Sequence, residues 1–286
     1  MIGLDISQHN GYIDFTKLKR EKSEIEFIII RIGWIGNKNN HTLDTYFEDY
    51  YKRAKENGYK IGFYVYNYCN NLSAMQNACD WILHKIKGKT IEMPIFLDME
   101  DSSIISSEKD MLTTMSKYFC NFFKNYGYDT GVYANKNWFT NYLDINSLLD
   151  YKIWLAEWNN KITFKYKVDL WQYSSNFMFN NKRFDINKCM CECNNTQGVE
   201  KPVNKKEVYV NMKAFINNTN YNSLVFCDSN CTRSIGSLNK GEKCDAIGIF
   251  ENGKGERVVA IIYTIDNSNP VNRKIGYLKL INGKVV

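Results

Sequence analysis

The sequence lacks the segments that would export a chain or place it in a membrane. No stretch approaches the run of about 18 consecutive apolar residues that a spanning helix needs. The first ten residues, MIGLDISQHN, contain no basic segment followed by a long apolar stretch, so we expect no signal peptide. The chain is therefore predicted to be synthesised in the cytoplasm without membrane insertion. If it acts outside the cell, another factor must release it.

Several types of chemistry are also missing. The three histidines have no metal-ligand spacing, and no Ser/His/Asp arrangement, Cys/His pair or phosphate-binding glycine loop stands out. The formal net charge of +6 comes without a dense Lys/Arg block, so we expect no nucleic acid as partner. A mild basic excess does favour contact with an anionic polymer such as a cell wall. Neither a metal nor another cofactor is predicted.

Cysteine is present but is not arranged as a disulfide framework. The nine cysteines are an odd number and are scattered, so free thiols are expected in a reducing compartment. The only cluster is Cys189, Cys191 and Cys193. Three thiols could hold a soft metal, but zinc sites usually use paired cysteines two to four residues apart. We expect no metal there, and the role of the cluster stays open.

What the chain does contain is an alternation of apolar strands and amphipathic helices. Nearly continuous apolar strands between helices favour an α/β fold with a parallel sheet, here a barrel that becomes irregular in its last third. Glycines 58, 88 and 127 are predicted to stop the helices, and Ser73 to cap the second one. Strands are predicted at 2–6, 27–33, 60–66, 93–100, 130–134, 152–158, 168–173 and 183–187, and helices at 43–57, 73–87 and about 108–125.

The composition changes near residue 194. Residues 194–206 are polar and contain Pro202, which is typical of a linker. Residues 207–286 carry short strand-like segments between Asn, Gly and Ser clusters, with no convincing helix, and predict a small β-barrel. The expected division is therefore a barrel domain at 1–193, the linker, and a second all-β domain.

A group of acids ends the fourth predicted strand, in the stretch PIFLDMED. Strand alternation places Asp98 and Glu100 on one face and Asp101 on the other. Two like charges on one face raise the pKa of at least one of them, which costs stability in a structural strand and is useful in an acid catalyst. Functional residues of such barrels lie where strands end, and this rule places Asp5 and Asp185 at the same rim.

Aromatic residues are expected at that rim as well. Carboxylates above aromatic rings suit a polysaccharide, because sugar rings pack on aromatic faces and glycosidic cleavage uses two carboxyl groups. Each ring could instead belong to the core. Arg31, inside an apolar strand, needs a partner if it is buried; we favour a rim carboxylate over a pair within the barrel. The candidate substrate-binding residues are Tyr64, Tyr66, Tyr133, Trp154, Trp171 and Arg31.

Several ordered segments of residues 1–190 resemble glycoside hydrolase family 25, the Chalaropsis-type lysozymes of phage endolysins and bacterial autolysins. The segments are GLDISQHNGYIDF, FIIIRIG, AKENGYKIGFYVY, IFLDME, IWLAEW, and LWQYSS followed by FDIN. Several family members read YHY or YHF where this chain reads YVY at 64–66, so a usual polar neighbour of Tyr66 is missing.

The resemblance implies an irregular (β/α)5(β)3 barrel and a lysozyme activity that needs no cofactor. Such an N-acetylmuramidase hydrolyses the β-1,4 bond from N-acetylmuramic acid to N-acetylglucosamine in peptidoglycan. The motif match makes Glu100 the general acid/base and Asp98 its partner. Asp5 and Asp185 match two further acidic positions of the family, and ionised Asp5, Asp98 and Asp185 are expected to hold a proton on Glu100.

The spacing of Asp98 and Glu100 leaves the mechanism open. Alternate Cα atoms of a strand are about 6.6 Å apart. The carboxyl groups could then match the separation of about 5–5.5 Å of retaining enzymes or the about 6.5–9.5 Å of inverting ones. In a third route the 2-acetamido oxygen of the substrate attacks while Asp98 orients it. We favour this retaining route, because N-acetylated sugars supply the group and members of the family are thought to retain configuration.

The segments SIGSLNKGEKCDAIG, at 234–248, and KIGYLKL, at 274–280, resemble a bacterial SH3-like cell-wall-binding domain. This implies that the second domain holds the enzyme on peptidoglycan. Alternatively, it only stabilises the barrel or contacts another subunit. Together the resemblances predict a modular endolysin or autolysin that reaches the wall after release, with the help of a holin if it is a phage product.

Two other functions stay open. One is a wall-binding protein whose barrel has lost activity, although the intact Asp98 and Glu100 argue against it. The other is a chitinase, although substrate-assisted chitinase barrels tend to carry a longer run of alternating acids than IFLDME. The sequence leaves open the host range, the wall ligand and the oligomeric state.

Overall fold

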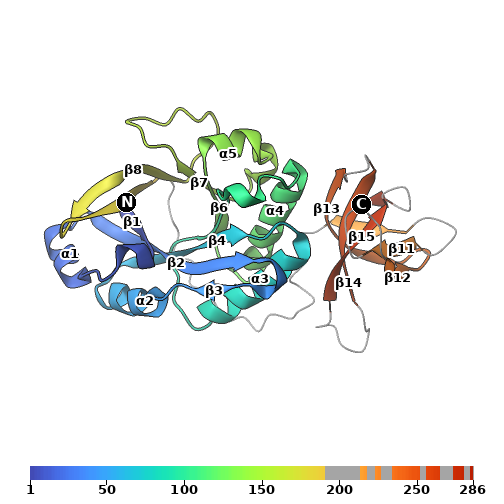
Figure 1. Ribbon diagram of the computed structural model, residues 1–286, viewed down its shortest axis with the longest axis horizontal. Helices are drawn as coiled ribbons and strands as arrows, with labels where there is room; N and C mark the ends of the chain where they lie inside the picture. The colour runs from blue at the N-terminus through green and yellow to red at the C-terminus, as the bar shows by residue number, and fades with distance from the viewer. Residues whose placement is uncertain are drawn as a thin grey trace. The chain divides into compact units, whose positions relative to one another are not determined.

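The structure is a computed structural model that describes two compact units, Met1–Glu200 and Lys201–Val286 (Figure 1). The predicted linker, 194–206, and two members of the cysteine cluster, Cys191 and Cys193, lie outside the described residues. The described ranges are 1–190, 213–217, 223–226, 234–251, 256–264, 273–279 and 284–285. No helix within these ranges is long and apolar enough to cross a membrane.

The first unit alternates strand and helix five times and ends in three strands. The pairs are β1 (Ile2–Ile6) and α1 (Phe15–Glu21), β2 (Ile25–Gly36) and α2 (Phe47–Glu56), β4 (Lys60–Tyr68) and α3 (Leu72–Ile86), β5 (Ile95–Asp98) and α4 (Lys109–Asn125), and β6 (Thr130–Asn135) and α5 (Lys136–Asn141). The last three strands are β7 (Lys152–Ala156), β8 (Leu170–Phe179) and β9 (Lys182–Cys189). The short strand β3 (Thr42–Leu43) pairs with β2.

Eight of these strands close into a barrel. Their order is β1-β9-β8-β7-β6-β5-β4-β2, and β1 pairs in parallel with β2 to complete the ring. The neighbouring strands in the series β1, β2, β4, β5, β6, β7 and β8 pair in parallel. Strand β9 is antiparallel to both of its neighbours, β8 and β1. The predicted α/β barrel with an irregular last third is confirmed.

The ends of the helices follow from local sequence. Gly58, Gly88 and Gly127 have φ angles of +75°, +76° and +83°, the left-handed conformation that ends a helix, so the three predicted stops are confirmed. The predicted cap at Ser73 is wrong. Asn71 caps α3 instead, because its side chain accepts a hydrogen bond from the backbone N–H of Ala74 at 2.9 Å.

Some elements differ from the prediction. The strand predicted at 93–100 is shorter, since β5 covers only Ile95–Asp98, and Glu100 follows it. Helices α1 and α5 were not predicted. They have seven and six residues, too few for a helical period to show in the sequence.

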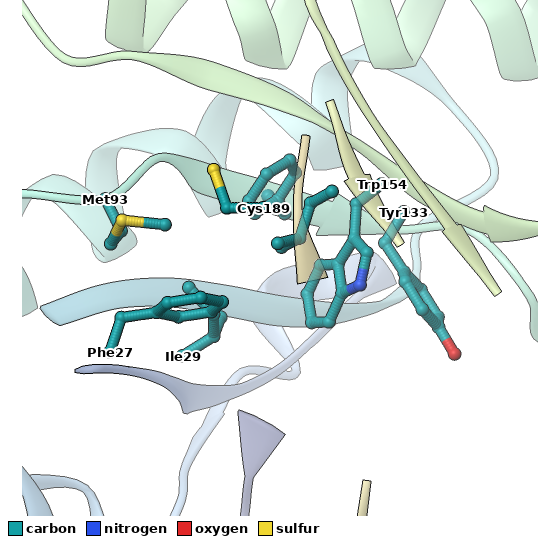
Figure 2. Packing of buried hydrophobic residues seen from close by; sticks show 8 residues of the cluster. Phe27, Ile29, Met93, Tyr133, Trp154 and Cys189 are labelled. Atoms are coloured by element: carbon teal, nitrogen blue, oxygen red, sulfur yellow. The ribbon is translucent and has the colours of Figure 1, made fainter. Parts of the chain in front are cut away.

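The interior of the barrel is packed with large apolar side chains (Figure 2). Gly3 makes room for one of them: a Cβ atom at this position would lie 2.3 Å from the ring of Phe27. The rings of Tyr133 and Trp154 lie next to each other, with 4.5 Å between their centroids. The buried cluster consists of Phe27, Ile29, Met93, Phe96, Tyr133, Trp154, Leu170 and Cys189.

The second unit is an antiparallel sheet. Its strand order is β12-β11-β15-β14-β13-β10-β16, and its buried cluster includes Val225, Val259 and Leu278. No helix occurs among its described residues. An SH3-like barrel stays a prediction. The strands are β10 (Lys213–Ile216), β11 (Ser223–Phe226), β12 (Ser234–Leu238), β13 (Lys243–Glu251), β14 (Arg257–Thr264), β15 (Arg273–Lys279) and β16 (Lys284–Val285).

Replacing Gly3 tests the packing of the barrel interior. Gly3→Ala should destabilise the fold by about 1–3 kcal/mol, because the added methyl group overlaps Phe27. Thermal unfolding, followed by circular dichroism, measures the effect, with Tm falling by about 2–4 °C per kcal/mol. Gly88→Ala is the control, since no atom lies within 4 Å of the added Cβ and only the positive φ is strained. A Tm for Gly3→Ala at or above that of the control would contradict the packing.

Candidate active site

The four predicted acids lie together at one end of the barrel. Asp98 is the last residue of β5, and Glu100 follows two residues later. Asp5 and Asp185 face each other directly across the antiparallel pair of β1 and β9. The charge of Asp185 acts on both Asp5 and Glu100, and the charge of Asp5 acts on Asp98. The structure therefore brings four carboxyl groups, from β1, from β9 and from the end of β5, into one electrostatic cluster.

Asp5 is buried and held by two amides. Gln172 Nε2 and Asn187 Nδ2 both donate to its Oδ2 atom, at 3.0 and 2.7 Å. Burial raises the pKa of Asp5 to about 7, the charge of Asp185 adds to the rise, and the two hydrogen bonds oppose it. Asp5 is therefore partly protonated at neutral pH.

Asp98 is the most enclosed of the cluster, with 3% of its surface exposed. Its Oδ1 atom is buried and has no hydrogen-bond partner among the described residues. Burial and the charges of Glu100 and Asp5 hold the pKa of Asp98 well above its usual range, although Arg31 opposes this. The expectation that Asp5 and Asp98 are simply ionised is therefore wrong. Burial raises the pKa of both carboxyl groups by more than the amides and Arg31 lower it.

Glu100 is only partly buried and is thus the more accessible member of the pair. Burial raises its pKa, the hydrogen bond with Tyr133 lowers it, and the charges of Asp185 and Asp101 raise it. Groups this close exchange protons as a set, so the cluster as a whole holds protons near neutral pH. An accessible carboxyl with a raised pKa is suited to general acid catalysis.

Aromatic residues form the wall below the acids. Trp154 is fully buried; its ring packs against Tyr64 at 5.9 Å and Tyr133 at 4.5 Å, and its indole donates to Asn187 Oδ1 at 2.8 Å. It is thus a core residue that supports the site from beneath. Tyr66 lies beside Asp98 in the β4–β5 register, and its hydroxyl donates to Asp101 Oδ2 at 3.0 Å.

Trp171 is not part of this set. Its neighbours Leu170 and Gln172 point into the barrel, so alternation along β8 places Trp171 on the outer face. There its indole donates to the backbone oxygen of Glu157 at 2.8 Å.

Arg31 does not bind a rim carboxylate directly, so the favoured partner was wrong. Its Nε atom donates to Asp44 Oδ2 at 2.8 Å, within a buried ion pair. Asp44 follows β3, a strand of two residues that no sequence pattern showed. The charge of Arg31 still reaches Asp98 and lowers its pKa.

Three residues of the site were missed in the sequence. Asn187 could have been found by strand alternation, because it lies two residues from Asp185. Gln172 could not, because the assignment of Trp171 to the rim places its neighbour on the opposite face. Trp158 follows β7 and is 64% exposed, and its indole donates to Gln172 Oε1 at 3.0 Å. A large exposed aromatic at the edge of an acidic site is a platform on which a sugar ring can stack.

The described residues contain no group of three or more His, Cys, Asp or Glu side chains placed to hold a metal ion. Cys189, the described member of the cysteine cluster, is buried in the barrel core.

Known proteins share this architecture and parts of the sequence. The profile of the Glycosyl hydrolases family 25 matches residues 4–182. The autolytic lysozyme of Clostridium acetobutylicum is 27% identical over 158 residues, which are 55% of this chain and 45% of that protein. The chain thus spans about half the length of this curated relative.

Solved structures show the same fold at low identity. The modular autolysin LytC from Streptococcus pneumoniae is 22% identical, with a TM-score of 0.57, over 65% of this chain and 46% of that one. A second LytC structure, in complex with a synthetic peptidoglycan ligand, is 23% identical over the same shares, with a TM-score of 0.56. The spore cortex lytic enzyme SleM from Clostridium perfringens is 15% identical, with a TM-score of 0.57, over 97% of both chains.

Asp5→Asn tests the electrostatic cost of the cluster. The folded chain keeps a proton on Asp5 up to a pKa of about 7, whereas the unfolded chain loses it near its ordinary pKa of 3.8. Burial of this carboxyl therefore destabilises the fold increasingly as the pH rises between these values. The variant should therefore be more stable than the wild type at pH 7, by a margin that shrinks toward pH 4. Thermal unfolding across this range measures the margin, and each kcal/mol raises Tm by about 2–4 °C.

Asp150→Asn, an exposed substitution just before β7 at the other end of the barrel, is the matched control and should show no such trend. A margin for Asp5→Asn that is the same at pH 4.5 and pH 7.5 would contradict the raised pKa.

Proposed function

The chain belongs to glycosyl hydrolase family 25, and we propose that it is a lysozyme that hydrolyses the β-1,4 bond between N-acetylmuramic acid and N-acetylglucosamine in peptidoglycan. The observation that carries the proposal is the cluster of four carboxyl groups at one end of a closed barrel, with raised pKa values. The likeness to an autolytic lysozyme, and to an autolysin solved with a peptidoglycan ligand, supports this substrate.

Glu100 is the general acid in this proposal. It is the accessible partner of the Asp98–Glu100 pair, and its raised pKa favours the protonated form that a general acid needs. It donates this proton to the glycosidic oxygen as the bond breaks. The resulting carboxylate then takes a proton from the water that completes hydrolysis.

Asp98 orients the substrate. Its buried Oδ1, which has no partner among the described residues, is suited to accept a hydrogen bond from the N–H of the 2-acetamido group. The acetamido oxygen then attacks the anomeric carbon as the leaving group departs, forming a cyclic intermediate that water opens with retained configuration. Direct attack by Asp98 is the alternative.

Asp5 and Asp185 tune the acid, and the aromatic residues bind the sugars. Asp185 acts on Glu100 through its charge and raises its pKa, and Asp5 does the same to Asp98. Among the aromatic residues we assign contact with the glycan to the rings of Tyr64, Tyr66 and Trp158. Tyr133 lies in the same buried cluster as Trp154 but reaches the site through its hydroxyl, and Trp171 lies on the outer face.

Analysis of the reducing ends released from peptidoglycan tests the proposal. Wild type should release muramic acid ends, and Glu100→Gln should lower the rate by about 10²–10⁴-fold, since it removes general acid catalysis. Glu56→Gln, on the exposed side of α2, is the control and should retain full activity.

Other outcomes would select other functions. Glucosamine ends would keep Glu100 as the acid but change the bond that is cleaved. Hydrolysis of chitin without hydrolysis of peptidoglycan would identify a chitinase. Binding to purified walls without any hydrolysis would identify a wall-binding protein. Equal rates for Glu100→Gln and wild type would remove Glu100 from the mechanism.

We also propose that the second unit is a cell-wall anchor and that the protein works as an endolysin or autolysin after release from the cytoplasm. Its antiparallel all-β sheet, within the described residues, is compatible with an SH3-like domain. The anchor would raise the effective concentration of glycan at the barrel. A holin would provide access to the wall if the protein is a phage product.

Removing residues 201–286 tests this anchor. Lysis of intact walls should fall at least about tenfold, because avidity is lost. Turnover of short soluble peptidoglycan fragments should stay the same, because the four acids belong to the first unit. Circular dichroism of the shortened chain checks that the barrel still folds. Equal losses on both substrates would show that the second unit supports the barrel and does not anchor it.

A further inference from the structure

A buried amide connects the exposed edge of the site to its acids. Gln172, which is 2% exposed, donates through Nε2 to Asp5 Oδ2 at 3.0 Å. Its Oε1 accepts from the indole of Trp158 at 3.0 Å and from the hydroxyl of Tyr133 at 3.3 Å. One side chain thus contacts a rim aromatic, an acid and the tyrosine that binds Glu100.

The orientation of this amide follows from the indole. An indole N–H can only donate, so the atom of Gln172 that faces Trp158 must be its oxygen, and its NH₂ group must face Asp5. The indole of Trp154 fixes Asn187 in the same way. Asp5 Oδ2 thus receives two N–H donors, and a proton on Asp5 resides on Oδ1.

The orientation of Gln172 determines which hydrogen bonds the Tyr133 hydroxyl can make. The Tyr133 hydroxyl has one proton and two neighbours, Glu100 and Gln172 Oε1. When Glu100 is ionised, Tyr133 donates to it. When Glu100 is protonated, Glu100 can donate to the Tyr133 oxygen, but only if the Tyr133 proton has another acceptor. Gln172 Oε1 is that acceptor.

We propose that Gln172 is a positioning residue which, oriented by Trp158, lets Tyr133 accept a hydrogen bond from Glu100 and so stabilises the acid form of Glu100. The inference rests on the proposed role of Glu100 as general acid. Trp158 is largely exposed, so a sugar ring stacked on it would shield its hydrogen bond to Gln172 from water. Binding of a sugar ring at Trp158 is thereby coupled to the protonation of Glu100.

Other charged groups also act on Glu100. Asp98 and Asp101 face it from β5 and the following loop, Asp185 from β9, and Asp5 from β1. All four are retained in the variants below. Gln172→Met does remove a hydrogen bond that lowers the pKa of Asp5, and Asp5 acts on Glu100. This second route does not involve Tyr133, so it shifts the profile equally with and without the tyrosine hydroxyl, and the double variant separates it from the proposed route.

The test is the pH dependence of kcat/KM on soluble peptidoglycan fragments, whose basic limb reports the pKa of the general acid. In Gln172→Met, Tyr133 can donate only to Glu100, which favours the ionised form. The limb should move to lower pH by about 0.7 unit, the effect of one hydrogen bond. Tyr133→Phe removes the bond that lowers the pKa of Glu100, so its limb should move to higher pH.

The double variant makes the test specific. Gln172→Met should add no further shift in the Tyr133→Phe background, because its effect passes through the tyrosine hydroxyl. Tyr151→Phe is the matched control. Tyr151 lies just before β7, and its hydroxyl donates to the side-chain oxygen of Asn121 at 2.9 Å. Removal of this hydroxyl should leave the basic limb unchanged. An unchanged limb in Gln172→Met, or an equal shift in both backgrounds, would overturn the proposal.

Trp158→Phe gives a second measurement at an exposed site, should Gln172→Met not fold. The ring stays, but the donor that orients Gln172 is lost, so the limb should move to lower pH while KM changes less than twofold. A rise in KM with an unmoved limb would show that Trp158 acts only as a platform and would overturn the coupling. If the wild type itself does not hydrolyse peptidoglycan, the proposed function fails, a result distinct from an active enzyme with an unmoved limb.

Discussion

The antiparallel pairing of β9 with β1 is the constraint on which the site depends. It closes the barrel and, in the same step, places Asp185 directly opposite Asp5. Like charges in such a pair repel, and burial adds a larger penalty. The repulsion is relieved by protons, so closing the barrel creates a group of carboxyls that hold protons near neutral pH.

The polar residues around the acids limit this cost. Gln172 and Asn187 donate to Asp5, and the indoles of Trp158 and Trp154 fix the direction of both amides. Buried polar groups are tolerated when each has a partner, and here the partners form a chain from the core to the rim. Asp98 Oδ1 is the exception among the four acids, which is why we assign it to the substrate.

Much of the fold could be predicted from the sequence, because its strands are long apolar runs and its helices end at glycines. The meeting of the four acids followed from the rule that strand ends share a rim, whereas their roles remain proposals. The partner of Arg31 could not be predicted, since Asp44 is placed by a strand of two residues. The outward position of Trp171 depends on the register of its strand. The contact of Trp158 with Gln172 depends on the path of a connection that has no regular structure. Patterns along the chain do not contain this information.

The Arg31–Asp44 pair has a mechanical consequence for the rim. Asp44 also accepts hydrogen bonds from the backbone N–H groups of Gln8 and Tyr46, so one buried carboxylate joins β2 to the segments that follow β1 and β3. The connection that carries Trp158 is held by Glu157, which binds Thr163 and Lys136 near the solvent. Buried, charge-assisted bonds open less often than solvent-exposed ones. The rim is thus held by a buried ion pair on the side of Asp44 and by bonds close to the solvent on the side of Trp158, and the second side should open more readily than the first.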